Sequence, residues 1–186
     1  MPWRIREKES MRKLSHTELV ERQTQNRNGS KLPFCVVLNN IRSLYNVGSI
    51  FRTADGVGVE KIWLCGVTGT PDGTKTRIGK TALGAEKAVP WEHREDIVNV
   101  LKELKAKNYQ IVLLEQAEAS IPYQEFIPEA PVCLVVGNEI TGVSNEIISL
   151  ADKAIEIEMA GLKNSLNVTV AFGVVAYHFR NCLVSA

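Results

Sequence analysis

Five polar residues stand where side chains can do chemistry, next to the ends of predicted strands and helices. Asn46 and Arg52 lie six residues apart on one predicted helix, and Glu139 follows an apolar, strand-like run. Ser165 and Asn167 open the last predicted helix, where a hydroxyl and an amide can reach a ligand. Each also has a structural explanation, because Asn and Ser favour helix caps and because charged groups favour the surface. Residue type alone leaves both interpretations open.

Two familiar phosphate-binding signals fail on spacing. The segment from Gly73 to Thr81 resembles a P-loop, but five residues instead of four separate its glycines, and no strand runs straight into it. The segment from Asp55 to Gly58 begins like a dinucleotide fingerprint, but it lacks the third glycine and ends a helix instead of opening one. The sequence therefore favours neither a nucleotide hydrolase nor a dehydrogenase.

The histidines and cysteines do not predict a metal centre. His16, His93 and His178 are isolated from each other and from the cysteines, and His178 is interpreted as a partner of a helix dipole. The four cysteines are far apart and form no C-x-x-C pair, so we interpret them as reduced thiols, mostly in the core. They are Cys35, Cys65, Cys133 and Cys182.

The elements that must position the polar residues alternate between strands and helices. Strands are expected at 34–39, 61–65, 109–114, 131–136 and 154–159, and helices at 46–58, 94–107, 144–151 and 165–181. This order predicts an α/β fold with a mostly parallel sheet covered by helices on both faces. Residues 66–80 hold four Gly and one Pro and are expected to form a long loop.

In a parallel sheet, ligands bind beyond the carboxyl ends of the strands. The places to search are therefore the polar turns that follow predicted strands, at 40–46, 66–80, 137–143 and 160–165. Asn46 and Glu139 lie in two of these turns, and Ser165 ends a third. We expect Glu139 to orient Asn46, Arg52 or its own loop by hydrogen bonding.

Composition indicates one globular domain with a basic extension. The chain has 186 residues, of which 45% are hydrophobic and 23% charged, with a net charge of +1. Residues 1–31 carry a net charge of +4 and begin a helix at Ser15, where Ser15 and Glu18 fit a capping box. Residues 32–186 carry a net charge of −3. No apolar run reaches the roughly 18 residues of a membrane span, and the first residues lack a secretory pattern, so we expect a cytoplasmic protein.

Three segments together resemble the motifs of the SpoU/TrmH family of RNA ribose methyltransferases, within the SPOUT superfamily. They are NVGSIFRTADGVGV at 46–59, LVVGNEITGVS at 134–144 and IEIEMAGLKNSLNVTVA at 155–171. The resemblance covers roughly residues 34–182, and the stretch from Lys80 to Trp91 is also similar to a segment seen in this family.

The resemblance implies a function and an assembly. It implies transfer of a methyl group from S-adenosylmethionine to a ribose 2′-hydroxyl of RNA, with no metal required. The small size of the chain slightly favours tRNA over rRNA as the substrate. The resemblance also implies a C-terminal trefoil knot and a homodimer, and the apolar residues around more than one face of the last helix favour such a dimer. The alternative is a catalytically inactive RNA-binding protein that keeps the fold.

The resemblance also assigns roles to residues. Arg52 matches the family's catalytic base, although an arginine pKa above about 12 favours contact with a substrate phosphate and stabilisation of the forming alkoxide. Asn46, Glu139, Ser165 and Asn167 complete the catalytic set. Glu158 stands where the family's third motif has proline, which predicts a looser loop and a charge near the pocket. The residues expected to enclose the adenosyl group are Leu114, Gly137, Ile157, Met159 and Leu166.

Overall fold

The computed structural model describes residues 12–27, 31–72 and 75–185, which divide between two compact units, 1–30 and 31–186. The first unit contains helix α1 (His16–Arg27). Its predicted capping box is confirmed, because the Ser15 amide donates to Glu18 Oε2 (2.8 Å) and the Glu18 amide donates to Ser15 Oγ (3.3 Å). Arg4, Arg6 and Lys8 of the expected basic extension lie outside the described residues.

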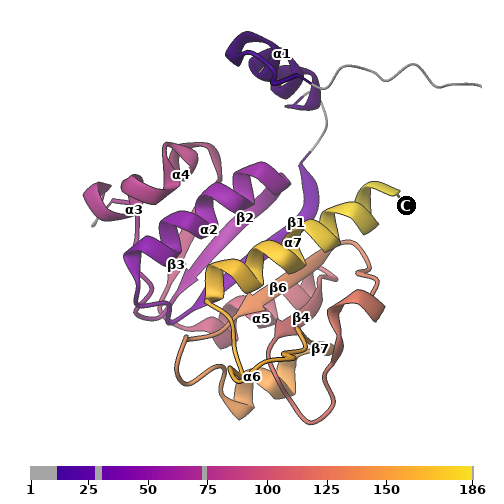
Figure 1. The fold of residues 1–186 in the computed structure, drawn as a ribbon. Helices are drawn as coiled ribbons and strands as arrows, with labels where there is room; N and C mark the ends of the chain where they lie inside the picture. Colours follow the sequence, from indigo (N-terminus) through magenta and orange to yellow (C-terminus); the bar gives the residue numbers. More distant parts are fainter. Residues whose placement is uncertain (1–11, 28–30, 73–74, 186) are drawn as a thin grey trace, which may run out of the picture. The chain divides into compact units, whose positions relative to one another are not determined.

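The second unit is built on one sheet of seven strands in which every neighbouring pair is parallel (Figure 1). The order is β3-β2-β1-β6-β4-β7-β5, so β1 and β6 are central. The predicted α/β fold with a mostly parallel sheet is therefore confirmed. The strands are β1 (Leu32–Asn39), β2 (Val59–Cys65), β3 (Trp91–Arg94), β4 (Gln110–Leu114), β5 (Ile121–Pro122), β6 (Val132–Val136) and β7 (Lys153–Glu156).

Helices cover both faces of the sheet. On one face, α2 (Leu44–Val57) and α7 (Val168–Ser185) pack side by side, and α3 (Lys75–Ala82) and α4 (Ala85–Ala88) pack against α2. On the other face lie α5 (Ile97–Ala106) and α6 (Asn145–Leu150). Strand β1 serves both cores, because Val36 and Leu38 point to the α2 side and Cys35 and Val37 to the α5 side.

The expected long loop at 66–80 is wrong, because α3 begins at Lys75. This helix packs on α2 at Gly48, where a Cβ atom would lie 2.2 Å from Thr81 Oγ1 and 2.3 Å from the Ile78 carbonyl oxygen. The Thr81 hydroxyl also donates to the Tyr45 carbonyl oxygen (2.9 Å). Tertiary contact with a glycine therefore makes a helix from a segment whose own composition favours a loop.

Several predicted boundaries also move. The expected strand 154–159 ends at Glu156, and the last helix begins at Val168 and not at Ser165. The expected helix 46–58 begins two residues earlier, at Leu44, and the helix expected from residue 94 begins at Ile97. The short strands β3 and β5 and the 3-10 turn η1 (Tyr123–Glu125) were not expected.

All four cysteines are free, and three of them are buried. Burial raises the pKa of the Cys65 thiol to about 12 and raises that of Cys133 well above its usual value. Both thiols are therefore protonated and packed in the core, and neither supplies a nucleophile.

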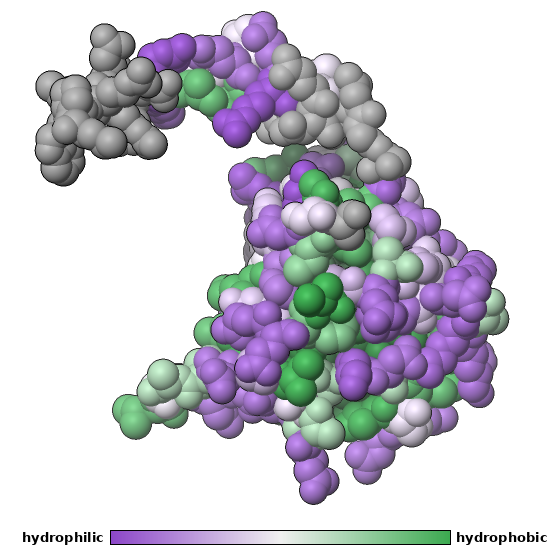
Figure 2. Space-filling model, turned by 90° about the vertical axis from the view of Figure 1, so that its right-hand side faces the viewer, coloured by the Kyte–Doolittle hydropathy of each residue, from purple (hydrophilic) through white to green (hydrophobic). Residues whose placement is uncertain are grey.

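Helix α7 is apolar on more than one side. Within the described residues it is the one helix whose length and hydropathy would allow it to cross a membrane. Five of its residues are buried in the core, yet Val170, Tyr177 and Val184 are exposed. On the face shown in Figure 2, hydrophobic residues form small groups among the hydrophilic ones.

Candidate active site

A pocket of about 390 Å³ opens at the carboxyl end of the sheet, beyond β4, β6 and β7. Its walls are the 137–143 loop, which follows β6, and the 157–167 loop, which connects β7 to α7. Strands β4 and β6 end side by side, with Leu114 opposite Val136, so they form the floor between the two loops. This is where a parallel sheet places a ligand site.

All five residues expected to enclose an adenosyl group line this pocket. Leu114 ends β4, Gly137 follows β6, and Ile157 and Met159 follow β7. Leu166 lies near the end of the 157–167 loop and is partly exposed. The structure therefore brings the expected set together, and the role of each member stays a prediction.

Two glycines shape the 137–143 loop for different reasons. Gly142 has φ of 62°, the left-handed conformation that glycine adopts without strain. Gly137 does not have positive φ. A Cβ atom there would lie 2.8 Å from the Gly142 carbonyl carbon, so glycine is needed for close approach.

Three of the predicted catalytic residues meet in one group, which we call the amide–carboxylate cluster (Asn46, Glu139 and Asn167). The Asn46 side-chain amide donates to Glu139 Oε1 (3.1 Å), and Asn167 Nδ2 lies 3.5 Å from Asn46 Oδ1. The residues come from α2, the loop after β6 and the start of α7, up to 121 residues apart in sequence. The expected hydrogen bond between Glu139 and Asn46 is therefore present.

The Asn46 side chain does not cap α2 and is therefore free to bond within the amide–carboxylate cluster. Ser43 caps α2, and its hydroxyl oxygen accepts from the Asn46 backbone amide (3.3 Å). The interpretation of Asn46 as the helix cap is wrong for that reason. Asn167 does cap α7, because its Oδ1 accepts from the Thr169 amide (2.9 Å).

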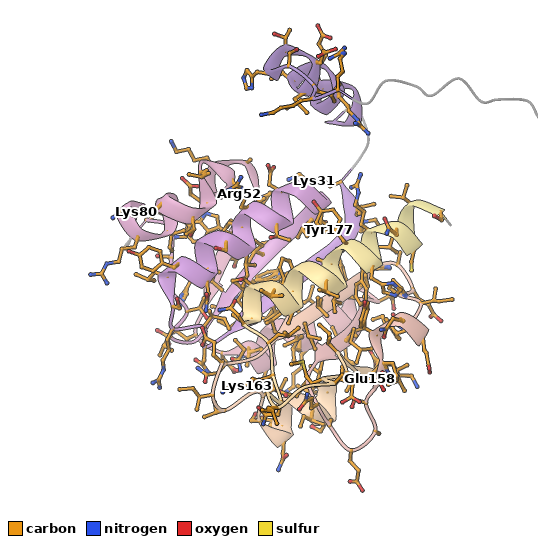
Figure 3. All side chains as sticks on the ribbon, viewed as in Figure 1. Lys31, Arg52, Lys80, Glu158, Lys163 and Tyr177 are labelled. Atoms are coloured by element: carbon orange, nitrogen blue, oxygen red, sulfur yellow. The ribbon has the colours of Figure 1, made fainter. Side chains whose placement is uncertain are left out.

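Ser165 and Arg52 lie apart from the amide–carboxylate cluster. Ser165 lines the pocket from an exposed position two residues before the α7 cap. Arg52 is exposed on α2, about 9 Å along the helix axis from Asn46, and it does not line the pocket (Figure 3).

The charges that line the pocket are all negative. Glu115, Glu139 and Glu156 contribute carboxylates, and no Lys or Arg belongs to the described lining. Glu158 does not line this pocket but an adjacent hollow of about 370 Å³, which it shares with Lys163. Three carboxylates suit a ligand that carries positive charge.

Sequence reasoning missed Glu115, Gln116 and Asn138. Asn138 organises its loop, because Oδ1 accepts from the amides of Ile140 (2.9 Å) and Thr141 (3.0 Å) while Nδ2 donates to the Asn40 carbonyl (2.7 Å). Glu115 and Gln116 directly follow β4. Applying the carboxyl-end rule to the strand expected at 109–114 would have found them.

The residues outside this site suggest no second centre. His178 Nε2 lies 2.7 Å from the Phe126 carbonyl oxygen, and His93 Nε2 lies 2.9 Å from that of Gly66. Among residues 12–27, 31–72 and 75–185, no three His, Cys, Asp or Glu side chains group as metal ligands would.

Comparison with known proteins assigns this architecture to a family. The model of the SpoU rRNA Methylase family matches residues 33–177. A tRNA (guanosine(18)-2′-O)-methyltransferase from Aquifex aeolicus is 37% identical over 143 residues, covering 76% of this chain and 66% of the relative. The chain spans 60% to 66% of the length of the first curated relatives that it matches.

Solved structures agree with the sequence match. The A. aeolicus TrmH/SpoU tRNA modifying enzyme superposes with a TM-score of 0.76 at 32% identity, covering 90% of this chain and 85% of that one. An AdoMet-bound rRNA methyltransferase from Sinorhizobium meliloti superposes with a TM-score of 0.75 at 28% identity, covering 83% and 59%. The fold is thus shared with SpoU/TrmH proteins of known structure.

Proposed function

Because the chain belongs to the SpoU rRNA methylase family, we propose that it transfers a methyl group from S-adenosylmethionine to a ribose 2′-hydroxyl of RNA. The observation that carries this proposal is the pocket between the 137–143 and 157–167 loops, which opens beside the amide–carboxylate cluster. A cofactor site and a group of polar side chains for a hydroxyl substrate are adjacent there.

The pocket residues fit S-adenosylmethionine. A volume of about 390 Å³ lies in the range of small-molecule sites. Leu114, Ile157 and Leu166 supply apolar surface for a purine ring, and Glu115 and Glu156 supply negative charge for a cation. When bound, the cofactor supplies an electrophilic methyl group, and the protein supplies the orientation of the hydroxyl and the environment of its proton.

The amide–carboxylate cluster and Arg52 contact different parts of the RNA. Glu139 fixes the Asn46 amide, so Asn46 and Asn167 present oriented polar groups to the ribose. Arg52 binds a phosphate of the same RNA strand and stabilises the oxyanion that forms as the hydroxyl passes its proton to solvent. Ser165 contacts the substrate or the cofactor from the opposite wall.

The proposed substrate class is tRNA, with rRNA as the second candidate. The relatives from A. aeolicus, Escherichia coli and Thermus thermophilus are named as tRNA 2′-O-methyltransferases. The inactive RNA-binding alternative is not supported, because relatives that are 30% to 37% identical are named as enzymes.

The proposal includes a trefoil knot and a homodimer. The knot would involve the 137–143 and 157–167 loops, and the likeness to family structures supports it. A crystal structure that traces residues 132–185 tests the knot. The dimer would use the exposed apolar side of α7, where Val170 and Tyr177 lie about half exposed at 50% and 47%.

Incubation with isotopically labelled S-adenosylmethionine and separated tRNA and rRNA fractions tests the activity. We expect label in tRNA, and mass spectrometry of the digested nucleosides should place it on a ribose. Label on a base, or no transfer to either fraction while S-adenosylhomocysteine binds, would contradict the proposed reaction.

A further inference from the structure

Glu115 and Gln116 are consecutive residues that leave β4 and enter the lining of the pocket. The Glu115 amide donates to the Ile155 carbonyl (3.1 Å), which extends the ladder between β4 and β7 by one residue. The backbone from which both side chains project is therefore anchored to the sheet.

The Glu115 carboxylate holds the wall that carries Glu139. Its Oε2 accepts from the Val143 amide (3.2 Å), and its Oε1 accepts from the Gln116 amide (3.0 Å). It also lies against Gly142, where a Cβ atom would be 2.3 Å from Oε2. The carboxylate thus fixes the end of the 137–143 loop, whose own bonds from Asn138 to Gly142 make it a stiff unit.

The Gln116 amide holds the opposite wall. Its Nε2 donates to the Asn164 carbonyl (2.8 Å). Residues 160–167 are all exposed, so few packing contacts restrain this stretch, and one hydrogen bond from the sheet has a large effect on it. Asn164 immediately precedes Ser165 and Leu166, which line the pocket.

We propose that Glu115 and Gln116, which we call the brace, are positioning residues that hold the two walls of the cofactor pocket at their working separation. The proposal rests on the proposed function for the identity of the ligand. Neither residue has to touch the reacting atoms, because each acts through the loop that it holds. Such restraint raises affinity by reducing the ordering that binding must impose on the loops.

Two pairs of variants test the brace on the full chain. Glu115→Ala removes the acceptor for the Val143 amide, while Glu115→Gln keeps an acceptor oxygen. Gln116→Glu keeps the size of the side chain but replaces the N–H donor by an acceptor. Matched controls are Glu118→Ala, on the exposed turn after the brace, and Gln124→Glu, exposed on η1.

The first measurement is amide hydrogen exchange in the cofactor-free protein. We expect the Val143 amide to exchange about tenfold faster in Glu115→Ala, as for the loss of one hydrogen bond, and at the wild-type rate in Glu118→Ala. This measurement needs neither cofactor nor RNA. An unchanged Val143 rate overturns the brace whatever the activity shows.

The second measurement is calorimetric binding of S-adenosylhomocysteine, followed by kinetics. We expect Glu115→Ala and Gln116→Glu to weaken binding about tenfold, and Glu115→Gln, which keeps one acceptor oxygen, to weaken it less than Glu115→Ala does. Gln116→Glu should raise KM for S-adenosylmethionine while kcat at saturation stays within about threefold. Unchanged affinity in both weakened variants overturns the proposal. If the wild-type protein binds no S-adenosylhomocysteine, the proposed function fails, and the exchange rates alone decide whether the brace holds the loops.

Discussion

Helices α2 and α7 pack against each other on the same face of the sheet, but their exposed sides differ in chemistry. α2 buries Val47, Ile50 and Phe51 and exposes Arg52. α7 buries Phe172 and Phe179 to a similar extent, yet it exposes Val170, Tyr177 and Val184. Two helices that are equally buried in the core can therefore have different functions. The residues on the exposed side of each helix indicate which kind of partner it can bind.

The proposed function gives each exposed side a partner. The polar side of α2 faces the RNA, and the apolar side of α7 faces a second copy of the chain. A change on one helix should therefore alter turnover, and a comparable change on the other should alter assembly. Two substitutions test this division and two more compare how the helices are held in the fold, from the largest expected effect to the smallest.

Arg52→Ala should lower kcat by about a hundredfold or more, because it removes a charge that stabilises the oxyanion. S-adenosylhomocysteine binding should not change, since Arg52 lies outside the pocket lining. Arg52→Lys should not restore turnover, because a point charge does not replace a planar guanidinium fork. Methylation by Arg52→Ala at nearly the wild-type rate would show that Arg52 is an ordinary surface residue.

Tyr177→Lys should raise the dissociation constant of the dimer roughly thirtyfold, because it places an unpaired charge in an apolar interface. Sedimentation over a range of concentrations measures the change. Asn99→Lys on the exposed side of α5 is the control and should leave the dimer intact. A wild-type protein that sediments as a monomer at every concentration would contradict the proposed dimer, and with it the assembly function of α7.

Gly48→Ala should destabilise the protein by about 2 kcal/mol, because the added methyl would overlap Thr81 Oγ1 and the Ile78 carbonyl of α3. Gly173→Ala on α7 should instead stabilise it by up to about 1 kcal/mol, since the nearest atom, Thr53 Cγ2, would lie 4.0 Å away. Unfolding in denaturant measures both. Equal effects would mean that α3 does not depend on the glycine contact.

Arg180→Ala should cost about 1 kcal/mol of stability and leave turnover nearly unchanged. Arg180 Nη1 donates to the Val57 carbonyl (2.6 Å) at the C-terminal end of α2, where a cation also favours the helix dipole. Arg180→Lys keeps a donor and the charge, so its melting temperature should fall less. A large loss of turnover in Arg180→Ala would show that α7 also supports the chemistry of α2.

Much of the fold follows from the sequence, because the strands that are buried on both faces are continuous apolar runs. β1, β2, β4 and β6 lie within two residues of their predicted positions at both ends. The segment from Lys75 to Ala88 was missed, because its helices bury only a few side chains, such as Ile78 and Ala82, and depend on contact with Gly48. Strand β3 was missed because it is a four-residue edge strand and three of its residues, Glu92, His93 and Arg94, are polar or charged.

The candidate site, like the fold, was predicted in part. Residue type and turn position, together with the family resemblance, identified the five pocket residues that the structure brings together. The hydrogen bond between Asn46 and Glu139 joins residues 93 positions apart, so only the fold decides which of the expected partners Glu139 takes. The types of Glu115 and Gln116 do not distinguish them from surface residues, so in the sequence only their position directly after the strand expected at 109–114 points to the brace.

The order of strands in the sheet has a consequence for how the chain is made. Strand β1 forms early in synthesis, but its neighbour β6 follows almost a hundred residues later, and Asn40 and Asn138, which bond at their ends, are 98 positions apart. Until the ribosome has released β6, β1 and β2 can pair with each other while the other edge of β1 stays open to solvent and to other chains. Closing so long a loop is slow, so the nascent chain passes through a stage with an apolar strand edge uncovered. Folding yield should therefore depend on how quickly the second half of the chain is translated.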